Sequence, residues 1–144
     1  MAASSGSAGR RQAVELVFEA FSRDQGLLDL VEQRAALVAS NQVDDAVPLL
    51  PEAVGLVRGV AEHQVVISEW LDTYSHGWTQ RRMAAVDRAI LYVGAYEVVF
   101  ADDVPDTAAI NGAADLAGKL STGRSAGFVS GVLGRLSKIK PTLL

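Results

Sequence analysis

The 144-residue sequence predicts an all-α protein, a compact bundle of six or seven helices. Apolar residues recur at spacings of three and four over most of the chain, which is the helical period. No segment alternates polar and apolar residues for long enough to predict a sheet. Segments rich in glycine, proline and serine are short, so the helices follow one another closely and pack together. Apolar residues make up 49% of the chain and charged residues 21%, which is the balance of a globular domain.

The first half of the chain predicts two helices and the start of a third. Residues 1–9, MAASSGSAG, predict a flexible N-terminal tail, and the first helix begins near Arg10. Its apolar face consists of residues spaced by three and four, namely Ala13, Leu16, Val17, Ala20 and Phe21. Gly26 separates this helix from a second one over residues 27–40. A linker that contains proline follows, and Pro51 suits the first turn of the next helix.

The second half of the chain predicts four helices. The first of them covers residues 52–75, with a kink near Gly59, and the turn SHGWTQ ends it. The other three cover about residues 82–100, 106–119 and 125–138. Because only short turns separate these elements, we expect a single domain over residues 10–140.

Glu97 lies on the apolar face of the predicted helix 82–100. The other residues of this face are Met83, Val86, Ile90, Val93 and Phe100. A carboxylate in an apolar core is costly unless it is paired or hydrogen-bonded. We therefore expect Glu97 to be a structural carboxylate, tethered to an arginine or a hydroxyl group. The alternative, a catalytic acid, requires a second reactive group and a pocket.

Charge is distributed unevenly along the chain. All 17 acidic residues lie between Glu15 and Asp115, and residues 12–115 carry a formal charge of −11. Both ends of the chain are basic and contain no acidic residue. Basic ends on an acidic protein favour an anionic partner such as RNA or a membrane surface. The alternative is that the basic C-terminal helix complements the acidic body of its own protein or its own helix dipole.

Several functional classes are disfavoured by what the sequence lacks. There is no cysteine, and His63 and His76 are the only histidines, so we expect no metal site and no cofactor. No hydrolase, metalloprotease or phosphate-loop motif is present, so we do not expect an enzyme. No apolar run is long enough to span a membrane, and the N-terminus does not have the pattern of a secretory signal. We expect a cytoplasmic protein with no membrane partner.

Three segments of the chain match one known pattern. They are RRQAVELVFEA near the start, GWTQRRMAAVDRAILYVGAYEVVF in the middle, and DVPDTAAINGAADLAGKLST followed by SAGFVSGVL near the end. Over residues 10–136 the chain resembles the NusB family of bacterial transcription antitermination factors. The resemblance implies an all-helical fold of two small bundles. It also implies binding of single-stranded boxA RNA together with NusE, a small-subunit ribosomal protein, in a complex that helps RNA polymerase pass terminators, notably in ribosomal RNA operons.

The resemblance also implies which residues face the RNA. In the family an arginine-rich N-terminus and the start of the last helix bind RNA, and the two chain ends lie near one another. Lys119 and Arg124 flank the loop before that helix. The expected RNA-binding residues are Arg10, Arg11, Lys119, Arg124, Ser125 and Phe128. For Phe128 the alternative is an ordinary core position at the start of an amphipathic helix.

Five positions depart from the family pattern: Tyr92, Gly112, Gly118, Arg124 and Ser130. These departures change the side chains that can form hydrogen bonds around the last two helices, and they change where positive charge lies on the helix surface. They leave open a second interpretation, a divergent homodimeric interaction protein with weak or no RNA binding. Members of the family occur both as monomers and as dimers.

Overall fold

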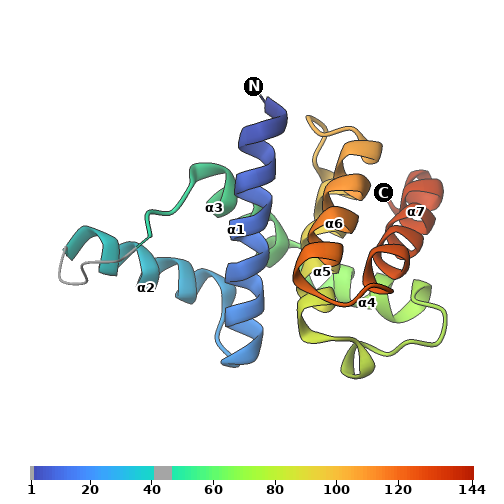
Figure 1. Ribbon diagram of the computed structural model, residues 1–144, viewed down its shortest axis with the longest axis horizontal. Helices are drawn as coiled ribbons and strands as arrows, with labels where there is room; N and C mark the ends of the chain where they lie inside the picture. Colours follow the sequence, from blue (N-terminus) through green and yellow to red (C-terminus); the bar gives the residue numbers. More distant parts are fainter. Residues whose placement is uncertain (1, 41–46) are drawn as a thin grey trace.

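The computed structural model describes residues 2–40 and 47–144, and every α-helix in these ranges is shown in Figure 1. The elements are α1 Ala2–Ser22, α2 Leu27–Ser40, α3 Pro51–Glu62, α4 Gln64–Tyr74, the short 3₁₀ helix η1 Gln80–Arg82, α5 Ala85–Phe100, α6 Asp106–Leu120 and α7 Ser125–Leu143. The prediction of an all-α bundle is confirmed, with seven α-helices and no strand in the described part of the chain.

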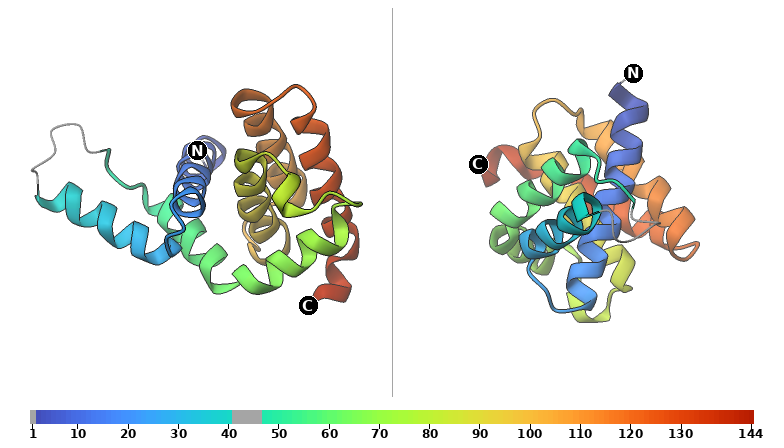
Figure 2. Two further views of the ribbon diagram at one scale, coloured as in Figure 1. Left: turned by 90° about the horizontal axis from the view of Figure 1, so that it is seen from below. Right: turned by 90° about the vertical axis from the view of Figure 1, so that its left-hand side faces the viewer.

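Helix α5 is the centre of the fold. It packs against α1 and α3 on one side and against α4, α6 and α7 on the other. The first three helices form one group, from which α2 extends outward, and α4 to α7 form a second group (Figures 1 and 2). The chain therefore consists of two small helical bundles that share α5 as their common wall.

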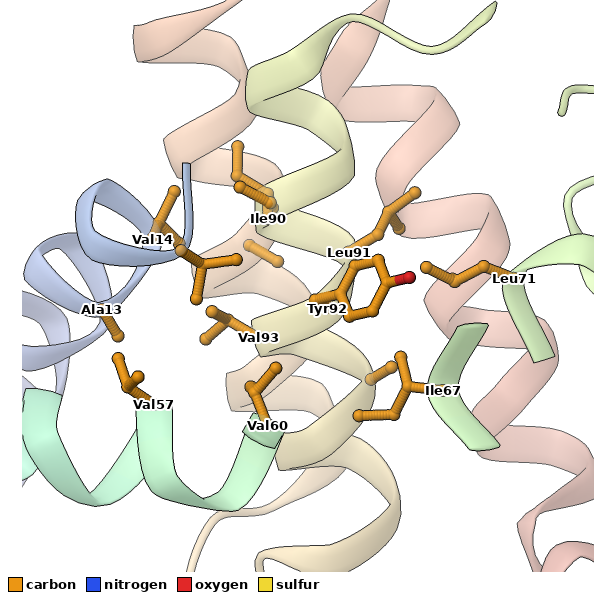
Figure 3. Close-up of a cluster of buried hydrophobic side chains, with 14 of the residues drawn as sticks. Ala13, Val14, Val57, Val60, Ile67, Leu71, Ile90, Leu91, Tyr92 and Val93 are labelled. Atoms are coloured by element: carbon orange, nitrogen blue, oxygen red, sulfur yellow. The ribbon is translucent and has the colours of Figure 1, made fainter. Parts of the chain in front are cut away.

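The sequence of α5 explains this central position, because apolar residues surround the whole helix and not one face of it. Ile90, Leu91, Tyr92 and Val93 are consecutive and all buried. In Figure 3 these four side chains point to different sides of the helix, toward α1, α3 and α4. Burial of a side chain such as Ile90 or Leu91 stabilises a fold by about 1.5–3 kcal/mol. A helix that is hydrophobic all round must be covered on every side.

The segment predicted as a tail over residues 1–9 is helical from Ala2 onward, and residue 1 lies outside the described part of the chain. Helix α1 begins at Ala2, and it is straight and continuous through Ser22 in Figure 1. Gly9 lies against α3, where a Cβ atom would come within 2.6 Å of Glu52 Cβ. The small residue therefore lets α1 and α3 approach closely at Gly9.

The predicted long helix 52–75 is divided at His63 and not kinked at Gly59. His63 has φ −114° and ψ 18°, and its N–H donates to the Gly59 carbonyl at 3.2 Å. Its ring stacks on Phe100, with ring centroids 3.7 Å apart. This stacking holds the junction between α3 and α4 against the end of α5.

No helix within residues 2–40 and 47–144 is long and apolar enough to cross a membrane.

Candidate nucleic-acid interface

Glu97 is paired with an arginine. An arginine or a hydroxyl group was expected for a carboxylate on this apolar face. Arg10 Nε donates to Glu97 Oε1 at 2.7 Å, and Arg10 Nη2 donates to Oε2 at 3.0 Å. The two side chains are only 10% and 2% exposed. Both carboxylate oxygens are thus satisfied by one planar guanidinium, which is the geometry that stabilises a buried pair most effectively.

The same pair removes Arg10 from the surface on which the sequence analysis placed it. Its guanidinium lies in the interior against Glu97, so the structure does not bring Arg10 to an exposed basic surface beside Arg11. The path of the side chain crosses α6 at Gly112, where a Cβ atom would overlap the guanidinium. The glycine at this position, one of the departures from the family pattern, therefore leaves the space that Arg10 occupies.

Two basic residues of α7 contact the body of the protein. Arg135 Nε donates to the Tyr74 carbonyl at 2.9 Å, and Lys140 Nζ donates to Asp106 Oδ1 at 2.8 Å. Part of the acid-free C-terminal segment thus binds the body of its own protein, which is the alternative to binding an anionic partner. Arg124, just before α7, and Lys138, near its end, are both exposed.

Ser125, the first residue of α7, is buried and anchors the preceding loop to α5. Its hydroxyl donates to Asp87 Oδ2 at 2.8 Å, and the hydroxyls of Ser121 and Thr122 lie 3.0 Å from it. The side chain of Asp87 is also buried. Its second oxygen, Oδ1, is fully buried and has no hydrogen-bond partner among the described residues. Ser125 therefore shapes the site from within.

A pocket of about 370 Å³ opens beside this pair. The walls of the pocket come from the turn before α5, the start of α5, the loop before α7 and the first turn of α7. The lining residues are Trp78, Arg82, Met83, Ala84, Asp87, Thr122, Arg124, Ser125 and Phe128. Three residues of the predicted RNA-binding set, Arg124, Ser125 and Phe128, thus lie together in this pocket. The volume of the pocket is within the range of small-ligand sites.

Aromatic and cationic groups line the mouth of the pocket. Trp78 is 50% exposed and Phe128 is half-buried, with ring centroids 6.2 Å apart and planes at 62°. Arg82 Cζ lies 5.5 Å from the centre of the Trp78 ring, within the range of a cation–π interaction. Arg82 and Arg124 are both exposed. Such a surface offers flat apolar faces to planar groups and positive charge to phosphates.

The remaining predicted residues lie outside this pocket. Lys119 is exposed on α6 and pairs with Asp115 one turn away, at 3.0 Å. Arg11 is exposed on α1. Neither residue lines the pocket. The predicted residues that do line it are Arg124, Ser125 and Phe128, at the start of α7.

Trp78, Arg82 and Asp87 line the pocket but are not among the residues predicted from the sequence. The segment around Trp78 was interpreted only as a turn, and Arg82 only as the beginning of a helix. An exposed tryptophan directly before two arginines, in WTQRR, was a usable signal, because such a combination favours stacking and phosphate contacts. Asp87 gave no comparable signal, because its burial results from the packing of α7 against α5.

A second hollow, of about 470 Å³, is lined in part by Arg10 and Glu97, and its other charged lining residues are acidic. Glu52, Asp103 and Tyr96 contribute to its lining. Burial raises the pKa of Tyr96, and the nearby carboxylates of Glu62, Asp103 and Glu97 raise it further. The negative charge of this region suits a basic partner better than RNA. Within the described ranges no group of three or more metal-ligating side chains is present.

Comparisons with known proteins agree over nearly the whole chain. The sequence model of the NusB family matches residues 7–138. The transcription antitermination protein NusB of Arthrobacter sp. (strain FB24) is 42% identical, and that of Paenarthrobacter aurescens (strain TC1) is 43% identical; each match covers 94% of both chains. The solved structure of NusB from T. maritima superimposes with a TM-score of 0.75 at 25% identity, covering 92% of this chain and 90% of the other. The chain therefore belongs to the NusB family.

Proposed function

We propose that this protein is a transcription antitermination factor that binds boxA RNA together with NusE. In this role it joins the RNA polymerase antitermination complex in the cytoplasm and supports transcription of ribosomal RNA operons. Membership of the family and the names of the relatives support the general role. The single observation that carries RNA binding is the pocket between the turn before α5 and the start of α7.

This pocket has the chemistry that single-stranded RNA requires. Single strands are held by stacking of unpaired bases on aromatic rings and by neutralisation of phosphates. Trp78 and Phe128 supply the rings, and Arg82 and Arg124 supply the charge. Arg11 on α1 and Lys119 on α6 are further exposed basic residues outside the pocket, whereas the guanidinium of Arg10 is paired with Glu97.

NusE binding is assigned to the acidic part of the molecule. The chain carries −11 over residues 12–115, and Glu52, Glu62 and Asp103 lie around the second hollow and Tyr96. Negative charge of this kind attracts a basic ribosomal protein and accelerates its association. Because the acidic hollow and the aromatic pocket are separate, RNA and NusE would occupy different surfaces.

The test is RNA affinity in the presence of NusE, measured by fluorescence anisotropy with labelled boxA RNA over a range of salt concentrations. We expect Arg124→Glu to weaken binding and to reduce the magnitude of the salt slope by about 0.7, the value for one phosphate contact on a single strand. Arg58→Glu is the matched control, because Arg58 is exposed on α3 and does not line the pocket. Equal affinities for both variants and the parent would contradict the assignment of RNA to this pocket.

A second candidate function, a homodimeric interaction protein, is favoured by one observation. A groove of about 490 Å³ between α1 and the α5–α6 region contains the half-exposed Phe18 together with Val86 and Leu120. An exposed apolar groove is typical of a protein–protein interface. Light scattering separates the two functions. A dimer that dissociates after Phe18→Glu and never binds boxA RNA would favour the second.

A further inference from the structure

The turn that carries Trp78 and Arg82 has little regular structure of its own. It connects α4 to α5 over residues 75–84, and the one-turn helix η1 is the regular element within it (Figure 1). Of residues 76–82, all except Gln80 are exposed. Because an exposed turn with few packed side chains is mobile, the position of Trp78 depends on what ties this turn to the body of the protein.

The amide nitrogen of Gln80 ties the turn to α4. Gln80 Nε2 donates to the Ser68 carbonyl at 3.2 Å and to the Ser68 hydroxyl at 3.0 Å, and it donates to Asp72 Oδ1 at 2.9 Å. Helix α4 itself packs against α5 and α7. These hydrogen bonds therefore join an exposed turn to a helix that the rest of the bundle holds in place.

The amide oxygen of the same side chain ties the turn to α5. Gln80 Oε1 accepts from Tyr92 Oη at 2.7 Å and from Arg88 Nε at 3.1 Å. Tyr92 is buried, and Arg88 Cζ lies 4.3 Å from the centre of the Phe21 ring on α1. One side chain thus connects the turn to two helices, through partners that are themselves held by packing.

The partners of Gln80 are matched to an amide, which donates at one atom and accepts at the other. The Ser68 carbonyl and the Asp72 carboxylate can only accept, whereas Arg88 Nε can only donate. A glutamate at this position would lose the donors and repel Asp72. An apolar residue of the same size would form none of these hydrogen bonds.

We propose that Gln80 is a positioning residue for RNA binding, which fixes the turn and thereby holds Trp78 in place to stack on a base. This proposal rests on the function proposed above. Arg82 Cζ lies 5.5 Å from the centre of the Trp78 ring, so its positive charge is fixed together with the ring. Side chains that are already ordered in the free protein lose less conformational entropy when a ligand binds. Gln80 therefore raises the affinity for RNA through Trp78.

The first measurement follows Trp78 in the absence of RNA. Trp70→Phe leaves Trp78 as the only tryptophan of the chain, and its time-resolved fluorescence anisotropy reports nanosecond motion of the turn. In this background we expect Gln80→Leu, which keeps the size but forms no side-chain hydrogen bond, to increase the amplitude of that motion. Gln25→Leu is the matched control, because Gln25 lies between α1 and α2, hydrogen-bonds Gln33 and does not line the pocket.

The second measurement is the affinity for labelled boxA RNA with NusE present. With Trp70 and Trp78 in place, we expect Gln80→Leu to weaken binding by about tenfold, the scale of ordering two side chains on binding. In a Trp78→Ala background the same substitution should cause no further loss, because Gln80 acts through Trp78. A general loss of folding stability would instead weaken binding in both backgrounds.

Tyr92→Phe is a milder variant that keeps the test decisive if Gln80→Leu does not fold, as judged by circular dichroism. It removes one donor to Gln80 Oε1 and leaves the ring and the Arg88 hydrogen bond. We expect it to change the motion of Trp78 and the RNA affinity in the same direction as Gln80→Leu, by smaller amounts.

Other outcomes would contradict the proposal or the function on which it rests. If neither Gln80→Leu nor Tyr92→Phe changes the motion of Trp78, Gln80 does not hold the turn. If Trp78 becomes mobile while RNA affinity stays the same, the proposal is wrong and the proposed function stands. An equal loss of affinity with and without Trp78 would make Gln80 a residue of the fold alone. If the parent does not bind boxA RNA with NusE present, the proposed function fails, and the inference fails with it.

Discussion

Asp87 and Glu97 are two buried carboxylates near opposite ends of the same helix, and their surroundings differ. Both oxygens of Glu97 are bound by the Arg10 guanidinium, at 2.7 and 3.0 Å. Asp87 has one oxygen bound by Ser125 and one without a partner among the described residues. Both residues line a hollow in the surface, Glu97 the acidic one and Asp87 the aromatic one, so the difference between them lies in how their oxygens are paired.

The difference shows that two carboxylates of similar burial on one helix can be satisfied to different degrees by the same protein. A fully satisfied carboxylate contributes its interactions to the folded state. A buried oxygen without a partner instead carries a desolvation cost that other interactions of the fold have to offset.

The largest expected effect is a loss of folding stability when the Arg10–Glu97 pair is broken. Glu97→Ala leaves the Arg10 guanidinium buried without a counter-charge, and Arg10→Ala does the reverse. We expect each variant to lower the free energy of unfolding by about 3–5 kcal/mol, measured by urea denaturation. Lys119→Ala breaks an ion pair whose side chains are 63% and 61% exposed, and it serves as the control with a far smaller effect.

The combined variant Arg10→Met with Glu97→Leu sharpens this test. Replacing a buried pair by apolar residues of similar size is often neutral or stabilising. We therefore expect the double variant to recover most of the lost stability. Unchanged urea midpoints in both single variants would instead mean that solvent reaches the pair.

The next effect concerns RNA affinity beside Asp87. Trp78→Ala removes the most exposed ring of the pocket, and stacking of a base is worth about 1–3 kcal/mol. We expect boxA RNA binding to weaken by that amount in anisotropy titrations, while the urea midpoint changes little, because half of Trp78 is exposed. Val65→Ala, at a side chain 76% exposed on α4, is the control. A loss of stability without a loss of affinity would make Trp78 a structural residue.

A smaller effect is expected for the stability of Asp87→Ala. This variant loses the hydrogen bond to Ser125 but also removes the unpaired oxygen, so the two changes partly offset each other. We expect the free energy of unfolding to fall by about 1 kcal/mol. A fall as large as that of Glu97→Ala would break the distinction between the two residues.

The smallest effect is the pH dependence contributed by Asp106, a carboxylate of intermediate exposure. Burial raises the pKa of Asp106, but hydrogen bonds from Lys140 and Ser137 outweigh it and leave the pKa below its ordinary value. Such a group stabilises the fold above its unfolded pKa and loses this contribution as the pH falls through the folded pKa. Between about pH 5 and pH 3 the parent should therefore lose slightly more stability than Asp106→Asn in urea titrations. Parallel curves would mean that the pair with Lys140 is solvated.

Much of the fold could be predicted from the sequence, because helical periodicity is a local property. The burial of Ile90, Val93 and Glu97 along one face follows from their spacing. The break at His63 was missed, since no proline or glycine marks it. Gly59 suggests a kink in the sequence, but in the structure the ring of Tyr96 packs against it and leaves no room for a side chain.

The candidate site was predicted less completely, because it depends on contacts between distant residues. Spacing indicated that Glu97 needs a tether, but it could not show that Arg10 supplies it. The family resemblance implied that Arg10 faces RNA, and the sequence alone does not show that its guanidinium is buried against Glu97. The incomplete hydrogen bonding of Asp87 depends on how α7 packs against α5, which the sequence does not reveal.

The Arg10–Glu97 pair also constrains the order in which the chain folds during synthesis. The two residues are 87 positions apart, so at about 5–20 residues per second the arginine waits roughly 4–17 s for its partner. Until α5 leaves the ribosome, the apolar face of α1 can pack against α3 but lacks its second large partner, and the guanidinium stays in water. The N-terminal bundle is therefore completed only after the central helix has emerged, and the two bundles should fold as one cooperative unit.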